Sequence, residues 1–322
     1  MTERCCMFHR RVRLRDNMRR MLLLCGLAAS TLVSAAHASQ EIFFDDFHYA
    51  DKAALLKGGW IIRGQRGHPG IDGGQWGSDS IALIDDVDNK GRRLLRLTAR
   101  TDGTPQGTFQ AQLCHQRKYL EGTYAARIRF SDAPVTGPNG DVVVQTFYAV
   151  SPLRFDLDPQ YSEMDWEYLP NGGWGDVNSR LYSVTWQTVQ MNPWQAYNQP
   201  HQKFVKLGNQ SGGWHTLVMQ AAAGKTRFFL DGEQQTENGG RNYPVVPMSI
   251  NFNLWFSPGG QLPDTSAERV YQQDVAWVFH ARNQVLSPAE VDDAVKDYRR
   301  AGTHQMDTVP QSEPPLASTC DF

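Results

Sequence analysis

Short runs in which hydrophobic and polar residues alternate fill the chain between about Glu41 and His280. This alternation is typical of β-strands, and clusters of Gly, Pro, Asn and Asp, as in "APVTGPNGD" and "DGEQQTENGG", separate the runs. Many strands without helices between them predict an all-β sandwich or barrel. The predicted strands cover residues 92–100, 122–130, 141–150, 162–169, 180–189, 214–222, 225–232, 248–256 and 274–281.

One helix is predicted, over residues 287–301. Ser287 is placed to cap it, Pro288 suits the first helical position, and Glu290 completes a capping box. An apolar stripe along the helix predicts that it packs on the outside of the sandwich, in a structural role. The polar, proline-bearing residues 303–322 that follow predict a flexible tail.

The first 38 residues have the pattern of a secretory signal peptide. Basic residues precede an apolar run that begins at Met21, and a site of small residues follows, so we expect cleavage after Ala38. Met18 is an alternative start of the chain. The apolar run is too short to span a membrane comfortably. We therefore expect one domain over residues 39–302, secreted or periplasmic, without a membrane anchor.

Composition and charge narrow the class of partner. The chain holds 9 Trp, 11 Tyr and 15 Phe, and charged residues make up only 20%, a mix that suits a β-rich protein. The formal net charge of −2 includes the arginines of the leader, so the mature chain is more acidic. This argues against nucleic acid or an anionic membrane as a partner. Cys114 and Cys320 remain after cleavage, and they either form a disulfide or stay as free thiols.

The stretch "YSEMDWEYLPNGGW" places three acids at two-residue spacing. In a strand, Glu163, Asp165 and Glu167 share one face. The other face, which we expect to enter the core, carries Met164, Trp166 and Tyr168. Like charges on one face repel one another and raise the pKa of at least one member.

Glycoside cleavage uses this chemistry, because it needs one carboxylate as nucleophile and one carboxylic acid as proton donor. A solvated acidic strand and a calcium site are the alternatives, although calcium ligands usually come from loops. Retaining glycosidases hold the two carboxyl groups about 5–5.5 Å apart. Residues four apart on a flat strand are about 13 Å apart at Cα, so the hypothesis requires a strongly bent sheet.

The segment "EMDWE" resembles the E-x-D-x-E signature of glycoside hydrolase family 16, which includes lichenases and laminarinases. Other segments resemble the family in the same order over about residues 41–281: "FFDDF", "GTYAARIRF", "GGWHTLVMQ", "FFLDG", "NFNLWF" and "VAWVFHA". The resemblance implies a concanavalin A-like jelly roll with a curved sheet. It implies an endo-acting, retaining hydrolase of a β-linked, β-glucan-like polysaccharide, with Glu163 as nucleophile, Asp165 as assisting carboxylate and Glu167 as general acid/base.

Amide and indole groups on another predicted strand suit sugar binding. In "SINFNLWF", Asn251, Asn253 and Trp255 share one face, where amides bind hydroxyls and an indole stacks on a sugar ring. The resemblance implies that Asn253 and Trp255 lie in the cleft and that Arg127 contacts the substrate.

The strand over residues 180–189 leaves two assignments open. Either Ser183, Thr185 and Gln187 line the cleft or Tyr182 and Trp186 do, because a one-residue slip exchanges the two sets. Polarity favours the first set, so Thr185 and Gln187 are predicted to bind substrate. Two aromatic loop segments are candidate walls of the cleft, the first with Trp174 and the second with Trp194 and Tyr197.

Three alanines depart from the family pattern. The resemblance places Ala125 and Ala221 where the family has substrate-contacting side chains, which implies an altered substrate. Ala276 stands where an Asp usually helps to bind calcium, so we expect no cofactor and doubt a structural calcium ion. We expect a monomer. A transglycosylase of the same fold and a non-catalytic carbohydrate-binding protein are the alternative functions.

Overall fold

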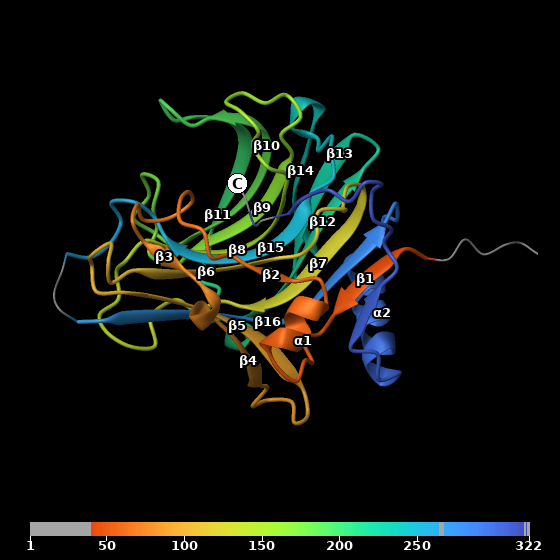
Figure 1. Cartoon of the computed structure of the whole chain (residues 1–322), viewed down its shortest axis with the longest axis horizontal. Helices are drawn as coiled ribbons and strands as arrows, with labels where there is room; N and C mark the ends of the chain where they lie inside the picture. Colours follow the sequence, from red (N-terminus) through yellow and green to blue (C-terminus); the bar gives the residue numbers. More distant parts are fainter. Residues whose placement is uncertain (1–39, 264–266, 319, 321–322) are drawn as a thin grey trace, which may run out of the picture. The chain divides into compact units, whose positions relative to one another are not determined.

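The computed structural model describes residues 40–263, 267–318 and 320, and the predicted signal peptide with its cleavage site lies outside these ranges. The strands of the described chain lie in two mainly antiparallel layers that pack face to face and are joined where β5 pairs with β6 (Figure 1). Each layer is here called a sheet. Within the described ranges, no helix is long and apolar enough to cross a membrane.

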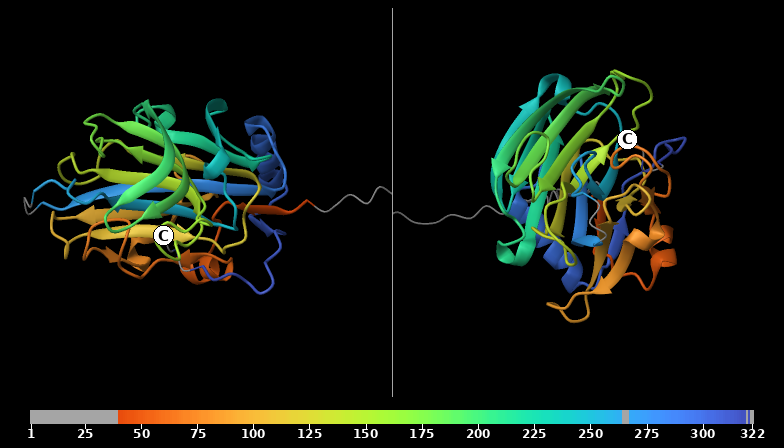
Figure 2. Two further views of the ribbon diagram at one scale, coloured as in Figure 1. Left: turned by 90° about the horizontal axis from the view of Figure 1, so that it is seen from above. Right: turned by 90° about the vertical axis from the view of Figure 1, so that its left-hand side faces the viewer.

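The sheet that carries the acidic strand is here called the front sheet. Its strand order is β2-β6-β15-β8-β9-β10-β11. Strands β9 to β11 bend strongly away from the rest, as Figures 1 and 2 show. The strands are β2 (Ile61–Ile62), β6 (Phe109–Cys114), β8 (Val143–Val150), β9 (Glu163–Leu169), β10 (Arg180–Gln190), β11 (Gln195–Phe204) and β15 (Ser249–Phe256).

The second sheet, the back sheet, has the order β4-β5-β16-β7-β12-β13-β14. Strand β1 pairs with the end of β16 and with β17, and the short β3 (Gln75–Trp76) runs parallel to β6. The strands are β1 (Ile42–Asp45), β4 (Ile81–Asp85), β5 (Arg93–Thr101), β7 (Gly122–Arg129), β12 (Trp214–Ala222), β13 (Lys225–Leu230), β14 (Glu233–Gly239), β16 (Arg269–Arg282) and β17 (Gln305–Asp307).

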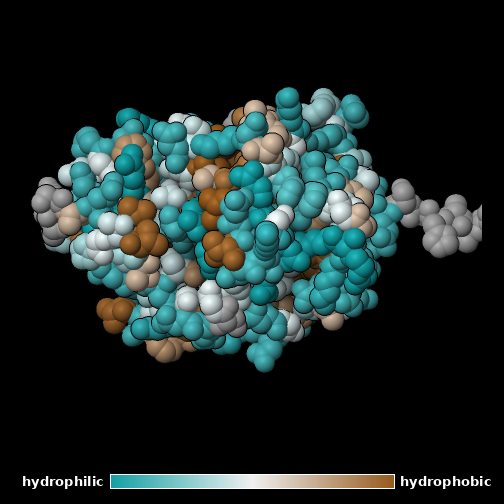
Figure 3. All heavy atoms as spheres, turned by 90° about the horizontal axis from the view of Figure 1, so that it is seen from below, coloured by the Kyte–Doolittle hydropathy of each residue, from teal (hydrophilic) through white to brown (hydrophobic). Residues whose placement is uncertain are grey.

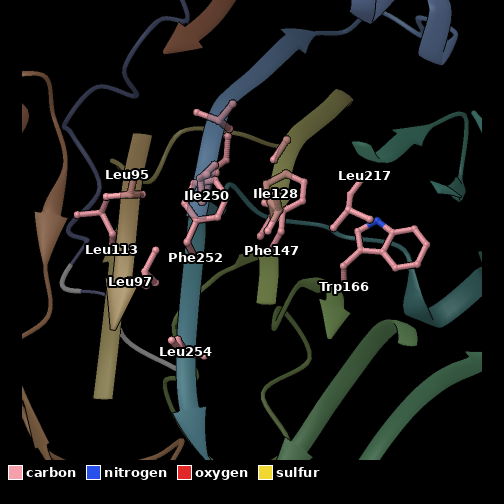
Figure 4. Packing of buried hydrophobic residues seen from close by; sticks show 14 of the residues in the cluster. Leu95, Leu97, Leu113, Ile128, Phe147, Trp166, Leu217, Ile250, Phe252 and Leu254 are labelled. Carbon is pink, nitrogen blue, oxygen red and sulfur yellow. The ribbon is translucent and has the colours of Figure 1, made fainter. Parts of the chain in front are cut away.

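The hydrophobic core lies between the two sheets (Figure 4). Phe147 of β8 and Phe252 of β15 stack with ring centroids 5.5 Å apart, and Trp166 of β9 meets Phe228 of β13 edge to face at 5.3 Å. The predicted inward residues of β9 are fully buried in this core. The side of the molecule that carries α1, β4 and β5 is mostly hydrophilic, with hydrophobic atoms in small separate groups (Figure 3).

Helix α2 (Pro288–Arg300) packs on the outer face of the back sheet, as predicted. The Ser287 side chain accepts from the Glu290 backbone N–H and Glu290 reaches back, which is the expected capping box. Phe44 of β1 stacks on Tyr298 of the helix at 5.1 Å. The short helix α1 (Lys52–Lys57), capped by Asp51, was not predicted, because its six residues show too little periodicity.

The C-terminal segment differs from the flexible tail that was expected. Within its described part, β17 pairs with β1, and the Lys118 ammonium donates to the Asp307 carboxylate at 2.7 Å. Cys320 forms a disulfide with Cys114 of the front sheet. The polar composition misled the prediction, because ion pairs and a covalent bond hold this segment rather than a hydrophobic stripe.

Candidate active site

A pocket of about 340 Å³ lies on the open side of the front sheet. Glu163, Asp165 and Glu167 of β9, here called the acidic ladder, form part of its floor. Strands β8 to β11 and β15 contribute to the pocket, together with the loops that carry His68, Trp174 and Trp194. The lining residues are His68, Pro69, Thr146, Tyr148, Glu163, Asp165, Glu167, Trp174, Val184, Trp186, Trp194, Ala196, Asn198, Asn253, Trp255, Ser257 and Pro258.

The register of β9 explains why its acids face the pocket. Asp165 pairs with Tyr148 of β8 and with Val184 of β10, and residues paired across an antiparallel ladder share a face. The opposite face of β9 carries Trp166, which the core buries. Alternation along one strand therefore aims three carboxyl groups outward while the aromatic residues hold the strand in place.

The three carboxyl groups have different hydrogen-bond partners. The Tyr161 hydroxyl donates to Glu163 Oε2 at 2.5 Å, and the Trp186 indole N–H donates to Asp165 Oδ2 at 2.5 Å. Glu163 and Asp165 are buried, whereas Glu167 is partly exposed to the pocket. Among the described residues, none donates a hydrogen bond to the Glu167 carboxyl group. Glu167 is thus the member of the ladder most open to a bound molecule.

Burial raises the pKa of each acid above its ordinary value, and the neighbours decide by how much. Burial raises the pKa of Glu163, while the Tyr161 hydroxyl and the Asp165 side chain oppose that rise. Burial and then the charge of Glu163 raise the pKa of Glu167. The pKa of Asp165 lies well above its ordinary range, because burial and then the charges of both glutamates act on it.

This ordering gives the ladder one ionised and one protonated glutamate over a range of pH. Glu163 loses its proton before Glu167, because Glu163 has donors that stabilise its charge. Asp165 stays protonated between them. An ionised carboxylate beside a protonated carboxyl group is the pair that double displacement at a glycosidic carbon requires.

Solved structures share this architecture. No family model matches the chain, and no curated protein matches it. A Bacillus licheniformis β-glucanase superimposes with a TM-score of 0.52 at 15% identity, covering 76% of this chain and 100% of the glucanase. A Bacteroides ovatus enzyme of glycoside hydrolase family 16, solved with a mixed-linkage glucan product, gives a TM-score of 0.54 at 15% identity over 73% and 98%. A Flavobacterium laminarinase gives a TM-score of 0.51 at 12% identity, covering 74% of this chain and 98% of the laminarinase.

The chain has the fold of the glycoside hydrolase family 16 glucanases. At these identities the likeness is one of fold, and it confirms the jelly-roll β-sandwich expected from the sequence. The bent front sheet that the carboxylate geometry requires is present in this fold (Figure 2).

In this family 16 fold, two of the three residues predicted from "SINFNLWF" and the Trp of the first aromatic loop lie at the pocket. Asn253, Trp255 and Trp174 all line the pocket. The Asn253 amide donates to the Tyr148 hydroxyl at 3.3 Å, and its buried Oδ1 has no hydrogen-bond partner among the described residues. Trp174 is 48% exposed and contacts the ring of Tyr182 at 5.1 Å.

The assignment of the strand over residues 180–189 was wrong. Trp186 pairs with Glu163 and faces the pocket, whereas the Thr185 hydroxyl, on the other face, accepts a hydrogen bond from Asn238 at 2.8 Å. A β-bulge interrupts the pairing of β10 with β11 at Gln187, and this residue is not among those that line the pocket. Polarity misled the choice, because Trp186 faces the acids with its indole N–H and serves as a donor to Asp165.

Two further predicted contacts do not reach the pocket. Arg127 lies on β7 of the back sheet, between the inward-facing Ala126 and Ile128, and its guanidinium donates to the Thr216 hydroxyl at 3.0 Å. Asn251 is on the pocket side of β15, but it is fully buried. Its amide N–H groups donate hydrogen bonds to the carbonyl and hydroxyl oxygens of Ser249.

The alanines that seemed to alter the substrate subsites are also remote from the pocket. Ala125 packs on the outer face of the back sheet in the cluster under α2, and Ala221 lies in the core. The inference of an altered substrate from these two positions is therefore wrong. Within the described ranges, no group of three or more His, Cys, Asp and Glu residues is placed to hold a metal ion. The doubt about calcium at Ala276 stays a prediction.

Several residues that line the pocket or donate hydrogen bonds to its acids were missed from the sequence. Tyr148 and Tyr161 belong to strand or turn segments in which only a known register shows the direction of the side chain. The segment with Trp194 was read as a loop, but it begins the hairpin strand β11, which brings Ala196 and Asn198 to the pocket. His68 and its loop carried no signal of a site, although the run of glycines around it indicates a turn.

Proposed function

We propose that the protein is a divergent member of glycoside hydrolase family 16 that hydrolyses a β-linked glucan with retention of configuration. One observation carries the proposal: three carboxyl groups share one face of β9, and their surroundings make Glu163 the readier to ionise and Glu167 the readier to keep its proton. The shared fold of solved glucanases supports it.

In the proposed mechanism, Glu163 attacks the anomeric carbon while Glu167 gives its proton to the departing glycosidic oxygen. The C–O bond to the leaving sugar breaks and an ester bond to Glu163 forms. Glu167, now ionised, takes a proton from a water molecule, which attacks the same carbon and releases the sugar from Glu163. Asp165 is a positioning residue, because it stays protonated between the glutamates and is held by Trp186.

The pocket surface indicates a neutral glycan as the substrate. Apart from the three acids and His68, the described lining residues carry no ionisable group except the Tyr148 hydroxyl, and none is Lys or Arg. Trp174, Trp194 and Trp255 supply faces on which sugar rings stack, and Asn253 Oδ1 would accept a hydrogen bond from a sugar hydroxyl group. The proposed chemistry needs no cofactor. We propose that the enzyme is a monomer and that the leader expected from the sequence directs it out of the cytoplasm.

A panel of β-1,3-, β-1,4- and mixed-linkage glucans, galactan and xyloglucan tests the proposal, with release of reducing ends as the measurement. Wild type and Glu233→Gln, a control on the exposed strand β14, should release reducing ends from at least one β-glucan. Glu163→Gln should lose activity by several orders of magnitude, because it has no nucleophile.

The alternatives give different results. Retained binding without any released reducing ends would favour the non-catalytic carbohydrate-binding protein. Longer products formed from an added acceptor oligosaccharide, in place of hydrolysis, would favour the transglycosylase. Activity that survives Glu163→Gln would contradict the assigned nucleophile.

A further inference from the structure

The pocket ends abruptly at β6, the strand beside β15 in the front sheet. Gln112 and Cys114 of β6 pair with Asn253 and Asn251 of β15, so these side chains share the pocket side of the sheet. Yet Gln112 is only 2% exposed and Cys114 is fully buried. Other parts of the chain therefore cover this end of the front sheet.

Residues 63–74, here called the cleft wall, contact the side chains of β6 at this end of the sheet. The Ile71 N–H donates to the Gln110 side-chain oxygen at 3.2 Å. Gly70 lies so close to the Gln110 side chain that a Cβ atom at residue 70 would be 2.3 Å from Gln110 Oε1. The φ of Gly70, +107°, also suits glycine alone. The disulfide from Cys320 covers Cys114 at the other end of β6.

One buried cation fixes the shape of the cleft wall. The Arg63 guanidinium is 4.0 Å from the centre of the Trp76 ring and donates to Gln112 Oε1 at 3.0 Å. It also donates to the carbonyl oxygens of Gln65 at 2.9 Å and of Gly67 and His68 at 3.0 Å each. A guanidinium with its donors spread over three carbonyl oxygens within residues 65–68 holds the loop as a fixed element.

The tip of the cleft wall reaches the opposite edge of the front sheet. The His68 ring stacks on Trp194 with centroids 5.2 Å apart and planes inclined by 30°. His68 follows β2 at one edge of the sheet, and Trp194 precedes β11 at the other edge. This contact crosses the hollow above the intervening strands, and both residues line the pocket.

We propose that the cleft wall and the His68–Trp194 contact close the substrate groove, so that the enzyme accepts a chain end and releases short products of uniform length. This inference rests on the proposed function and specifies its substrate. The resemblance implied an endo-acting enzyme, which needs a groove open at both ends. A pocket of about 340 Å³ lies near the lower limit of ligand pockets, about 300–1,000 Å³, and has room for a few sugar units only.

The experiment compares wild type with Trp194→Ala and with a control, Phe204→Ala. Trp194 is 50% exposed and Phe204 is 63% exposed on the same hairpin, so both variants should fold, but only Trp194 lines the pocket. The viscosity of a soluble β-glucan, the reducing ends released and the product lengths are followed together. Wild type and Phe204→Ala should release short products while the viscosity falls slowly. Trp194→Ala should lower the viscosity several-fold more per reducing end and yield longer products.

A binding measurement tests the effect of the cleft wall on substrate length independently of catalysis. In the inactive Glu163→Gln background, affinity for β-glucan oligosaccharides should stop rising after a few sugar units. Replacement of residues 65–69 by two glycines in that background should let the affinity rise further with oligosaccharide length.

The possible outcomes distinguish failure of this inference from failure of the proposed function. A rapid fall in viscosity with products of mixed length from wild type, or product patterns that are the same in wild type and Trp194→Ala, would overturn this inference alone. An affinity that already rises with length in the parent would do the same. Failure to cleave any glycan would overturn the proposed function, and the inference with it.

Discussion

In the proposed mechanism, two glutamates on one strand take opposite roles because their nearest neighbours differ. Tyr161 donates a hydrogen bond to Glu163, whereas Glu167 faces the pocket without a donor among the described residues. The negative charge of Glu163 also raises the pKa of Glu167. Burial alone would raise the pKa of both groups, so it is the donor that sets the order of ionisation.

Tyr161→Phe removes that donor and tests this order. Without the hydroxyl, the charged form of Glu163 loses a hydrogen bond, so its pKa should rise. The rising, acidic limb of the kcat/KM profile against pH should therefore move to higher pH, while the falling limb, set by Glu167, should stay in place. Tyr197→Phe, at a residue that does not line the pocket, should leave both limbs unchanged. An acidic limb that stays or moves to lower pH would contradict the role of Tyr161.

The raised pKa of Glu167 also predicts how stability depends on pH. The folded protein keeps a proton on Glu167 at pH values where the unfolded chain, with an ordinary pKa of about 4.3, has lost it. Stability is therefore lost as pH rises from the ordinary pKa through the raised one. Glu167→Gln cannot ionise, so its melting temperature should exceed that of wild type at pH 8 and match it at pH 4. A variant less stable than wild type at pH 8 would contradict the raised pKa.

One face of strand β9 packs in the core, and its other face carries the three acids of the pocket. Its carboxyl groups could be assigned from the sequence, because three acids cannot enter a core and the bulky residues between them can. The same reasoning failed for β10, where one face carries the aromatic residues and the other the small polar ones, so that polarity favoured the wrong face, and a bulge breaks the period. Pairing with β9 decides which face of β10 meets the pocket, and a single sequence does not contain that register.

The two faces of this region should respond differently to truncation. Trp166→Ala removes a fully packed ring that contacts Phe228 and should lower the free energy of unfolding by about 3–5 kcal/mol. Trp174→Ala, at a half-exposed ring over the pocket, should change it by about 0.5 kcal/mol or less and should weaken binding of oligosaccharides. Urea unfolding and calorimetric titration measure both effects. Equal loss of stability in the two variants would contradict the assignment of Trp166 to the core and of Trp174 to the pocket surface.

At the scale of the whole molecule, the all-β class, most strands and the C-terminal helix could be predicted from periodicity and capping. The cleft wall and the C-terminal segment could not, because hydrogen bonds from one buried arginine and a disulfide hold them, and neither produces a periodic pattern. Arg127 shows the limit of a motif carried over by position, since the neighbouring residues of β7 turn it to the outer face of the back sheet.

The disulfide should stabilise the fold, because it joins residues separated by 206 positions. Cys320→Ser should lower the free energy of unfolding by about 2–5 kcal/mol, since the cross-link restricts the unfolded chain. Wild type treated with a reductant should match the variant, and the variant should not respond to the reductant. Equal stability of oxidised wild type and Cys320→Ser would contradict this contribution.

The central claim is that Glu163 forms a covalent bond to the sugar. Incubation with a 2-fluoro-β-glucan oligosaccharide that carries a good leaving group, followed by intact-mass and peptide mass spectrometry, tests it most directly. The account predicts a mass increase equal to the 2-fluoro-oligosaccharyl group, which is the probe without its leaving group, located on Glu163, and no adduct in Glu163→Gln. An adduct on Asp165 or Glu167, or turnover of β-glucan by an enzyme that never forms an adduct, would contradict it.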